Sequence, residues 1–245
     1  SDSSGGAGIQ ADLKPIAAHH LFGERVITAL TAQNTLGVTD VLEVDPVFVG
    51  TQIDAVFDDI RPDAVKIGMV SSSAIVGAIA DVLERQLFPR ATVITPNIPE
   101  AEVLSGRAIA SSEDVEAAAS LIADRCVAVW ENASDFTDAA PSVPAILIKG
   151  GHGVDAPDAA ADYLRMADGE SVWLRGTRIA NDNTHGTGCS LSSAIACGLA
   201  RGFSVDVAVR DAKAYVAGAL AAGLNLGRGS GLLDHMWQYG TPMPC

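Results

Sequence analysis

Basic residues are scarce in this sequence: 16 lysines and arginines stand against 30 aspartates and glutamates, a net charge of −14. Lys and Arg form no cluster, which excludes nucleic acid and anionic membrane surfaces as partners. The chain also lacks any run of about 18 uncharged apolar residues, so no segment spans a membrane. A polyanionic ligand must therefore be held by local dipoles, a few placed cations and a metal.

Cysteine is sparse as well, and its spacing excludes a disulfide scaffold. The four cysteines stand at positions 126, 189, 197 and 245, and no pair has Cys-x-x-Cys spacing. No basic segment followed by an apolar one marks a signal peptide. We expect reduced thiols in a cytoplasmic protein.

What is abundant is apolar residues, which make up 48% of the 245. This is enough to bury the core of one large α/β domain or two small ones. Strand and helix patterns alternate, which predicts a parallel sheet with helices on both faces. No Pro-, Gly- or Ser-rich linker and no internal repeat divides the chain, so a single domain is expected.

The polar stretch 183–190 leads directly into the apolar, small-residue segment 191–200, the pattern of a loop that feeds a helix. Gly186 and Gly188 permit a close backbone approach. The first N–H groups of a helix lack intrahelical partners, so this loop is a candidate anion site. Cys189 lies at the same helix start, where a thiolate is favoured. An ordinary capped helix with a small buried cysteine is an equally good interpretation of these residues alone.

A second glycine-rich loop, residues 5–8, precedes a helix carrying Leu13, Ile16 and Ala17. It lacks the Gly-Lys-Ser/Thr ending of a Walker A loop. Its glycines allow a close approach to a ligand, although a flexible turn is the alternative. Such loops follow a strand in α/β proteins, so we expect a first strand that is missing from this sequence.

Polar residues follow several predicted strands, where ligands bind in parallel sheets. The strand 25–33 ends in the amides Gln33 and Asn34, which suit the edge of a heterocycle. The strand 64–69 ends in Met69, which by itself is more often a core residue. Lys149 follows the strand 145–148 and precedes glycines; it can reach a phosphate or be a solvated loop lysine.

Asn97 follows the strand 92–95 and Glu100 stands three residues later, as in a helix-capping arrangement. Because they lie at the carboxyl edge of the sheet, the Glu100 carboxylate could instead hold Mg²⁺ through water.

The remaining pattern predicts helices over 46–60, from Ser111 or Ser112 to Ala128, and over 205–226. It also predicts a hairpin of 162–166 and 171–175 around Asp168-Gly169. Residues 130–143 are expected to form a surface loop and 153–161 a mobile lid. Residues 227–245 are expected to form a tail in which Trp237 packs back.

Six of these segments, in this order, resemble motifs of the ribokinase-like superfamily, and specifically of its hydroxymethylpyrimidine/phosphomethylpyrimidine kinases of thiamine biosynthesis. They are 1–14, 27–35, 63–69, 94–101, 149–152 and 183–194. Six motifs in family order are far more specific than any one of them. The resemblance implies one three-layer α/β/α domain over residues 1–245, with a mostly parallel sheet.

The resemblance also implies an ATP-dependent kinase that acts on a hydroxymethylpyrimidine and then on its monophosphate, as a homodimer. Cys189 would stand where related sugar kinases carry an aspartate base. The implied pyrimidine contacts are Asp2, Gly5, Gln33 and Met69. The implied anion hole is Gly186, Thr187 and Gly188. The implied ATP contacts are Asn97, Lys149, Thr184 and His185, and Glu100 would belong to the Mg²⁺ site.

The sequence departs from that family between Ser71 and Thr92, where the family has a further βα unit. We expect residues to be missing near Arg85 and Gln86, because deleting a central strand would leave unpaired ladder groups and a cavity. Two other functions remain open. One is a pyridoxal/pyridoxine kinase, and the other is a catalytically inactive, pyrimidine-binding regulatory protein.

Overall fold

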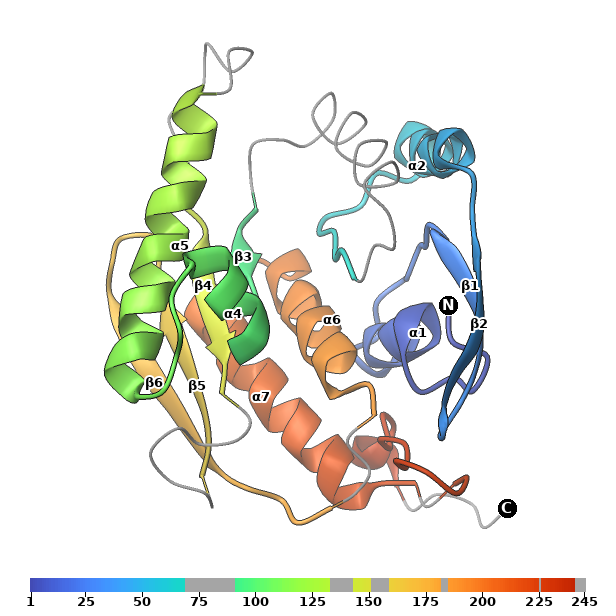
Figure 1. The fold of residues 1–245 in the computed structure, drawn as a ribbon. Helices are drawn as coiled ribbons and strands as arrows, with labels where there is room; N and C mark the ends of the chain where they lie inside the picture. The colour runs from blue at the N-terminus through green and yellow to red at the C-terminus, as the bar shows by residue number, and fades with distance from the viewer. Residues whose placement is uncertain (69–90, 133–142, 151–158, 182–184, 225, 241–245) are drawn as a thin grey trace. The chain divides into compact units, whose positions relative to one another are not determined.

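The structure is a computed structural model that describes residues 1–68, 91–132, 143–150, 159–181, 185–224 and 226–240. The chain divides into two compact units, one formed by Ser1–Gln86 with Ile179–Cys245 and the other by Leu87–Arg178 (Figure 1). Each unit is described by itself below. In these ranges no helix is both long enough and apolar enough to cross a membrane.

The first unit consists of helices and one hairpin. Its elements are α1 (Gly8–Ala18), β1 (Ala29–Asn34), β2 (Gly37–Glu43), α2 (Pro46–Asp59), α6 (Thr187–Ala200), α7 (Val205–Ala222) and the 3₁₀ turn η1 (Trp237–Tyr239). Helices α6 and α7 lie side by side. Their backbones come so close that a Cβ on Gly198 would lie 2.7 Å from the Cβ of Ala208. Small residues at this crossing therefore set the distance between the two helices.

The tail packs back on α7 as the sequence predicts. The ring of Trp237 lies over Gly218, where an added Cβ would meet it at 2.2 Å. The hydroxyl of Tyr215 donates to the carbonyl oxygen of His235, 2.8 Å away. These contacts hold His235 and Trp237 against a helix that also packs on α6.

The second unit is a mixed sheet with two helices. Its elements are β3 (Val93–Ile94), α4 (Ile98–Ser105), α5 (Ser112–Asn132), β4 (Ala145–Lys149), β5 (Ala159–Arg165) and β6 (Ser171–Thr177). The strand order is β3-β4-β5-β6, with β3 parallel to β4 and the other pairs antiparallel. In the described residues the sheet is therefore mixed, and the prediction of a mostly parallel sheet is wrong for them. The β5–β6 hairpin turns at Asp168-Gly169 as predicted, with Gly169 at φ +93.

The core of the second unit lies between β4 and one face of α5. Ile146 and Ile148 on β4 are fully buried. The buried residues of α5 recur at helical spacing, and they are Val115, Ala118, Ala119, Ile122 and Ala123. This apolar stripe is what an amphipathic helix presents to a sheet.

The segment 25–34 differs from its sequence prediction. The strand begins only at Ala29 and pairs antiparallel with β2, which the sequence analysis did not predict. Before it, the side-chain amide of Gln52 accepts from the N–H of Ile27 and donates to its carbonyl, both at 3.1 Å. The side chain of Gln52 thus takes the place of a neighbouring strand at Ile27.

The strand predicted over 64–69 is not formed in its described part, residues 64–68. Val65 and Ile67 are exposed, while the ammonium of Lys66 lies between the two carboxylate oxygens of Asp12, 2.9 Å from each. A partly buried ion pair with α1, rather than a strand ladder, fixes this segment.

Candidate active site

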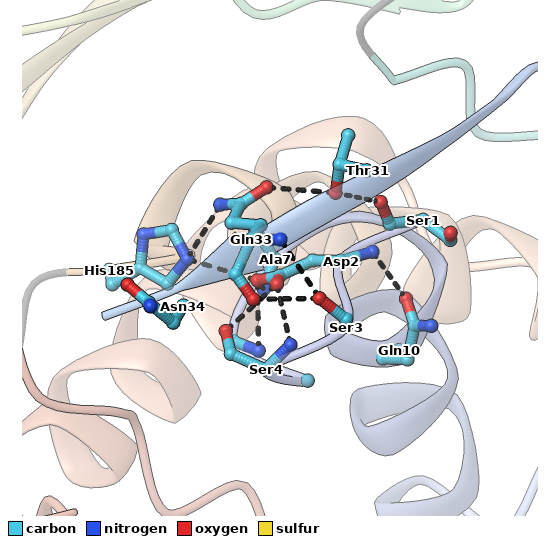
Figure 2. A network of polar contacts seen from close by, with 12 residues as sticks. Ser1, Asp2, Ser3, Ser4, Ala7, Gln10, Thr31, Gln33, Asn34 and His185 are labelled. Carbon is cyan, nitrogen blue, oxygen red and sulfur yellow. Dashed lines mark hydrogen bonds and ion pairs between the residues drawn. The ribbon is translucent and has the colours of Figure 1, made fainter. Parts of the chain in front are cut away.

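The first glycine-rich loop is organised by the carboxylate of Asp2, whose side chain is 1% exposed. One oxygen accepts from the N–H and the hydroxyl of Ser4, both at 2.8 Å. The other accepts from the N–H groups of Gly6 at 3.2 Å and Ala7 at 2.8 Å (Figure 2). Asp2 therefore shapes the loop; its predicted contact with a pyrimidine stays a prediction.

Asp2 is held in its charged form by these contacts. Burial opposes ionisation of the carboxyl, but hydrogen bonds from Ser4, His185 and Ala7 outweigh burial and lower its pKa below the usual value. A buried carboxylate with several donors is a fixed negative charge at the start of α1.

His185 joins this loop to the hairpin. Its Nε2 lies 3.1 Å from a carboxylate oxygen of Asp2 and 3.3 Å from the side-chain nitrogen of Gln33. The sequence analysis assigned His185 to ATP, and that role stays a prediction. The structure places its ring against Asp2 and Gln33, the two polar residues predicted to contact the pyrimidine. No sequence motif indicated this contact.

Gln33 is fixed from several directions. Its backbone N–H donates to the hydroxyl of Ser3 at 2.9 Å, and that hydroxyl donates to the carbonyl of Gln33 at 2.7 Å. Figure 2 shows its side-chain amide between the ring of His185 and the hydroxyl of Thr31, which lies 3.1 Å from the amide oxygen. Gln33 is only half-buried, so the rest of the amide can reach a ligand.

The two glycine-rich loops pack directly on each other. A Cβ on Gly186 would lie 1.9 Å from the carbonyl oxygen of Gly6. A Cβ on Gly6 would lie 2.4 Å from the ring of His185 and 2.5 Å from the side chain of Leu232. Gly5 has φ +76 and its carbonyl accepts from the ammonium of Lys14 at 2.6 Å. A side chain at Gly6 or Gly186 would therefore push the two loops apart.

The start of α6 offers backbone donors. Gly186 precedes the helix at φ +83, and the first intrahelical bond runs from the N–H of Ser190 to its carbonyl, 2.9 Å. No side chain in the described residues caps this end. The N–H groups of Thr187, Gly188 and Cys189 precede that bond, so the helix does not satisfy them. Such an end attracts an anion.

Cys189 lies in this first turn and is half-buried. Cys197, two turns further along α6, is buried, and burial raises the pKa of its thiol to about 11. Cys197 is therefore an inert core thiol. Cys189 is the thiol of α6 that a ligand at the helix start can approach.

In the second unit, three residues predicted to contact nucleotide and metal come together. Asn97 and Lys149 are partners in a parallel β-bridge, in which the N–H of Lys149 donates to the carbonyl of Pro96 at 2.8 Å. Asn97 caps α4, and Glu100 closes a capping box by accepting from the N–H of Asn97 at 2.8 Å. Glu100 therefore caps α4 at the carboxyl edge of the sheet, which is also where its predicted role as a Mg²⁺ ligand requires it to be.

These residues fit Mg²⁺ in one specific way. No group of three or more His, Cys, Asp or Glu side chains that could hold a metal occurs among the described residues. One oxygen of Glu100 is used by the cap, while the side chain is exposed. Mg²⁺ keeps several waters and takes one or two carboxylates plus substrate phosphates. Glu100 can supply one such carboxylate to an ion held mainly by phosphates and water.

Two predicted contacts, Met69 and Thr184, lie outside the described residues, as do the junction at Arg85 and Gln86 and most of the predicted lid. One partly buried polar cluster was not predicted from the sequence. Asp12 pairs with Lys66 and accepts from the hydroxyl of Ser193 on α6, 2.8 Å away. The signal available was an acidic residue on α1 and an isolated lysine in an apolar run.

Comparison with known proteins gives one consistent family. The model of the family described as phosphomethylpyrimidine kinase matches residues 2–87 and 79–234. A hydroxymethylpyrimidine/phosphomethylpyrimidine kinase of Streptomyces coelicolor is 40% identical over 271 aligned residues, covering 98% of this chain and 93% of the relative. That alignment is longer than the 245 residues of this chain. The family match also breaks at 79–87, where the sequence analysis expects a missing βα unit, which stays a prediction.

Solved structures agree on the ribokinase-like fold. A pyridoxal kinase of Staphylococcus aureus in complex with AMP-PCP has a TM-score of 0.82 and 28% identity, covering 97% of this chain and 91% of that one. A phosphomethylpyrimidine kinase of Clostridium difficile has a TM-score of 0.69 and 36% identity, covering 89% and 94%. The α/β fold class is confirmed, and the chain belongs to the phosphomethylpyrimidine kinase family of phosphotransferases.

Proposed function

We propose that this protein transfers the γ-phosphoryl group of ATP to 4-amino-5-hydroxymethyl-2-methylpyrimidine and then to the monophosphate, in thiamine biosynthesis. The observation that carries the proposal is the junction of the two glycine-rich loops. It brings the amide of Gln33, the start of α6 and Cys189 into one unit. An amide that offers a donor and an acceptor, together with an anion-binding helix end, suits an aminopyrimidine that is being phosphorylated.

Each of the predicted site residues has a role in this proposal. Gln33 reads the pyrimidine ring, with Met69 and the loop at Asp2 and Gly5 forming the rest of the pocket. Cys189 takes the proton of the substrate hydroxymethyl group. The N–H groups at Gly186, Thr187 and Gly188 stabilise charge on the transferring phosphoryl group. Phosphoryl transfer depends on such positioning and charge stabilisation more than on covalent chemistry.

The nucleotide is held by Asn97, Lys149, Thr184 and His185 in this proposal. Lys149 supplies a positive charge at a strand end in a chain of net charge −14, where few cations are available. The exposed carboxylate of Glu100 would hold Mg²⁺, and the ion would supply positive charge to neutralise the phosphates. The use of ATP is consistent with a cytoplasmic enzyme.

Pyridoxal is the second candidate substrate. Solved pyridoxal kinases superpose on 97% of this chain, and one of them holds both AMP-PCP and pyridoxal. The curated relative from Streptomyces coelicolor has the higher sequence identity, 40% against 28%, and its name specifies pyrimidines. We therefore place pyridoxal as a side substrate at most.

We further propose a homodimer and one ribokinase-like domain over residues 1–245. Every residue of β2 is exposed, and Leu36, Val38, Val41 and Leu42 give the hairpin a large apolar surface. Monomeric proteins rarely expose such a patch on an open strand. Sedimentation equilibrium tests this: the wild type should be dimeric and Leu42→Glu monomeric. A monomeric wild type contradicts it.

The test of the function is turnover with each substrate. The full chain with Mg²⁺-ATP should phosphorylate hydroxymethylpyrimidine and its monophosphate, with a higher kcat/KM than for pyridoxal. Tight pyrimidine binding without any turnover would instead identify an inactive binding protein, for which the break at residues 79–87 would be the cause.

A further inference from the structure

The side-chain amide of Gln33 has a hydrogen-bonding partner on each side. Each partner can pair with only one end of the amide, either its nitrogen or its oxygen. At one end stands Nε2 of His185 and at the other Oγ1 of Thr31. The nitrogen and oxygen ends of an amide are nearly equal in size, so hydrogen-bond chemistry decides between the two orientations.

His185 can only donate at this point. Its Nε2 lies 3.1 Å from a carboxylate oxygen of Asp2, which is buried and already accepts from Gly6 and Ala7. A carboxylate held ionised by such donors accepts and never donates. Nε2 of His185 therefore carries a proton in either charge state of the ring. Nε2 then has no lone pair for the amide nitrogen of Gln33, and its one N–H, shared with Asp2, can meet only the amide oxygen.

Thr31, on the other side of the amide, favours the same orientation. Its hydroxyl has one proton, and the carbonyl oxygen of Ser1 lies 2.5 Å away, which takes that proton. The Thr31 oxygen then faces Gln33 with a lone pair and requires the amide nitrogen. Two independent partners thus agree on one orientation of the amide.

We infer that His185 and Thr31 hold Gln33 with its amide oxygen toward His185 and its nitrogen toward Thr31, and so determine which heterocycle the site accepts. In the structure the nitrogen faces His185 and the oxygen faces Thr31. A half-turn of the amide about the Cγ–Cδ bond exchanges the two ends without moving any other atom. One N–H and one lone pair of the amide remain for the ligand, in a fixed order. His185 acts here as a positioning residue for substrate selection.

This inference rests on the proposed function and extends it to specificity. An aminopyrimidine has a ring nitrogen beside an exocyclic amino group, which matches a fixed N–H next to a fixed carbonyl. The amino group would lie on the His185 side and the ring nitrogen on the Thr31 side. The ring nitrogen of pyridoxal is flanked by a methyl group and a C–H, so the lone pair of the amide oxygen that faces the ligand has no donor to pair with. An unpaired polar group lowers affinity.

The test compares His185→Leu, which lacks the donor, with His185→Gln, which restores one. We expect His185→Leu to raise the Kd for hydroxymethylpyrimidine, measured calorimetrically without nucleotide, about five- to tenfold. The preference for hydroxymethylpyrimidine over pyridoxal in kcat/KM should fall by a similar factor. His185→Gln should recover most of the loss, and the exposed control His20→Leu should behave as wild type.

A double-mutant cycle shows whether His185 acts through Gln33. In a Gln33→Ala background, His185→Leu should add less than about a twofold effect on the pyrimidine Kd. Thr31→Val tests the other end of the amide and should reduce the same preference, whereas Thr51→Val on the exposed face of α2 should not. If His185→Leu misfolds, the Thr31 variants decide the question.

Several results would overturn the inference. They are an unchanged pyrimidine Kd in both His185→Leu and Thr31→Val, full additivity with Gln33→Ala, or a loss confined to the KM for ATP. In each of these cases wild-type turnover with the pyrimidine leaves the proposed function intact. A wild type that neither binds nor phosphorylates the pyrimidine overturns both.

Discussion

The Cα of Gly186 lies against the carbonyl oxygen of Gly6, so that a Cβ on residue 186 would stand 1.9 Å from that oxygen. Gly186 also adopts φ +83, a conformation that L side chains rarely take. Two independent constraints therefore require glycine where the first loop meets the start of α6. The position of Cys189, three residues later, depends on this contact.

Replacing Gly186 with Ala should both destabilise the protein and misplace Cys189. We expect the free energy of unfolding to fall by about 3 kcal/mol, from the left-handed conformation and the steric clash together. Activity toward the pyrimidine should fall at least about a hundredfold, as for a displaced reacting group. Urea titration and steady-state kinetics measure the two effects.

The matched control is Gly202→Ala. Gly202 has φ +78 but no atom within 4 Å of an added Cβ. It should lose only about 1 kcal/mol and keep its activity. Equal losses in the two variants would show that backbone conformation alone, and not the contact with Gly6, accounts for the effect.

Cys189→Ala should reduce kcat strongly while leaving pyrimidine binding nearly intact. A positioned general base contributes about 10²–10⁴-fold to the rate, and we expect a loss in that range. The Kd for hydroxymethylpyrimidine should change less than about threefold. Cys126→Ala, at a half-buried thiol on α5, is the control and should keep full activity. A loss of kcat below tenfold would mean that Cys189 only shapes the pocket.

Lys149→Met should weaken the interaction with nucleotide and not with pyrimidine. Lys149 ends β4 and its backbone is bridged to Asn97. Removing a charge-assisted hydrogen bond to phosphate should raise the KM for ATP about tenfold or more. Lys213→Met on α7 provides the control. An unchanged KM for ATP together with a raised KM for the pyrimidine would mean that Lys149 contacts the pyrimidine and not the nucleotide.

Acid should destabilise the first unit through His235. Burial, reinforced by the charge of Lys14, lowers the pKa of His235 from 6.5 to about 4, and its Nε2 lies 2.8 Å from the hydroxyl of buried Ser190. Between these two pH values the unfolded chain binds a proton that the folded protein excludes. Stability is therefore complete above pH 6.5 and falls as the pH drops toward 4.

The size of this effect is about 3 kcal/mol over the whole window. Thermal unfolding of His235→Gln, which keeps a hydrogen-bonding group without the titration, should show a shallower loss of Tm between pH 6.5 and 4. His20→Gln, at an exposed histidine, should retain the wild-type slope. Identical slopes for wild type and His235→Gln would disprove this account.

Sequence reasoning predicted well where local chemistry decides the structure. The capping pair Asn97 and Glu100, the helix start after Gly186 and the turn at Asp168-Gly169 are all formed as predicted. Each depends on residues that lie within a few positions of one another. The ordered motifs then gave the family, which the comparisons confirm.

The rest depends on partners far apart in the sequence. The amide of Gln52 pairs with Ile27, and Lys66 pairs with Asp12 instead of lying within a strand. His185 contacts Gln33, 152 residues before it, and Asp2, 183 residues before it. No local pattern distinguishes such a histidine from one that faces a nucleotide, so its place in the site came only from the structure.

The measurement that tests the central claim most directly is a coupled ATPase assay of the full chain with Mg²⁺, using hydroxymethylpyrimidine, its monophosphate and pyridoxal in parallel. The account predicts turnover with both pyrimidines and a lower kcat/KM with pyridoxal. Turnover with pyridoxal alone, or no turnover with any of the three, would contradict it.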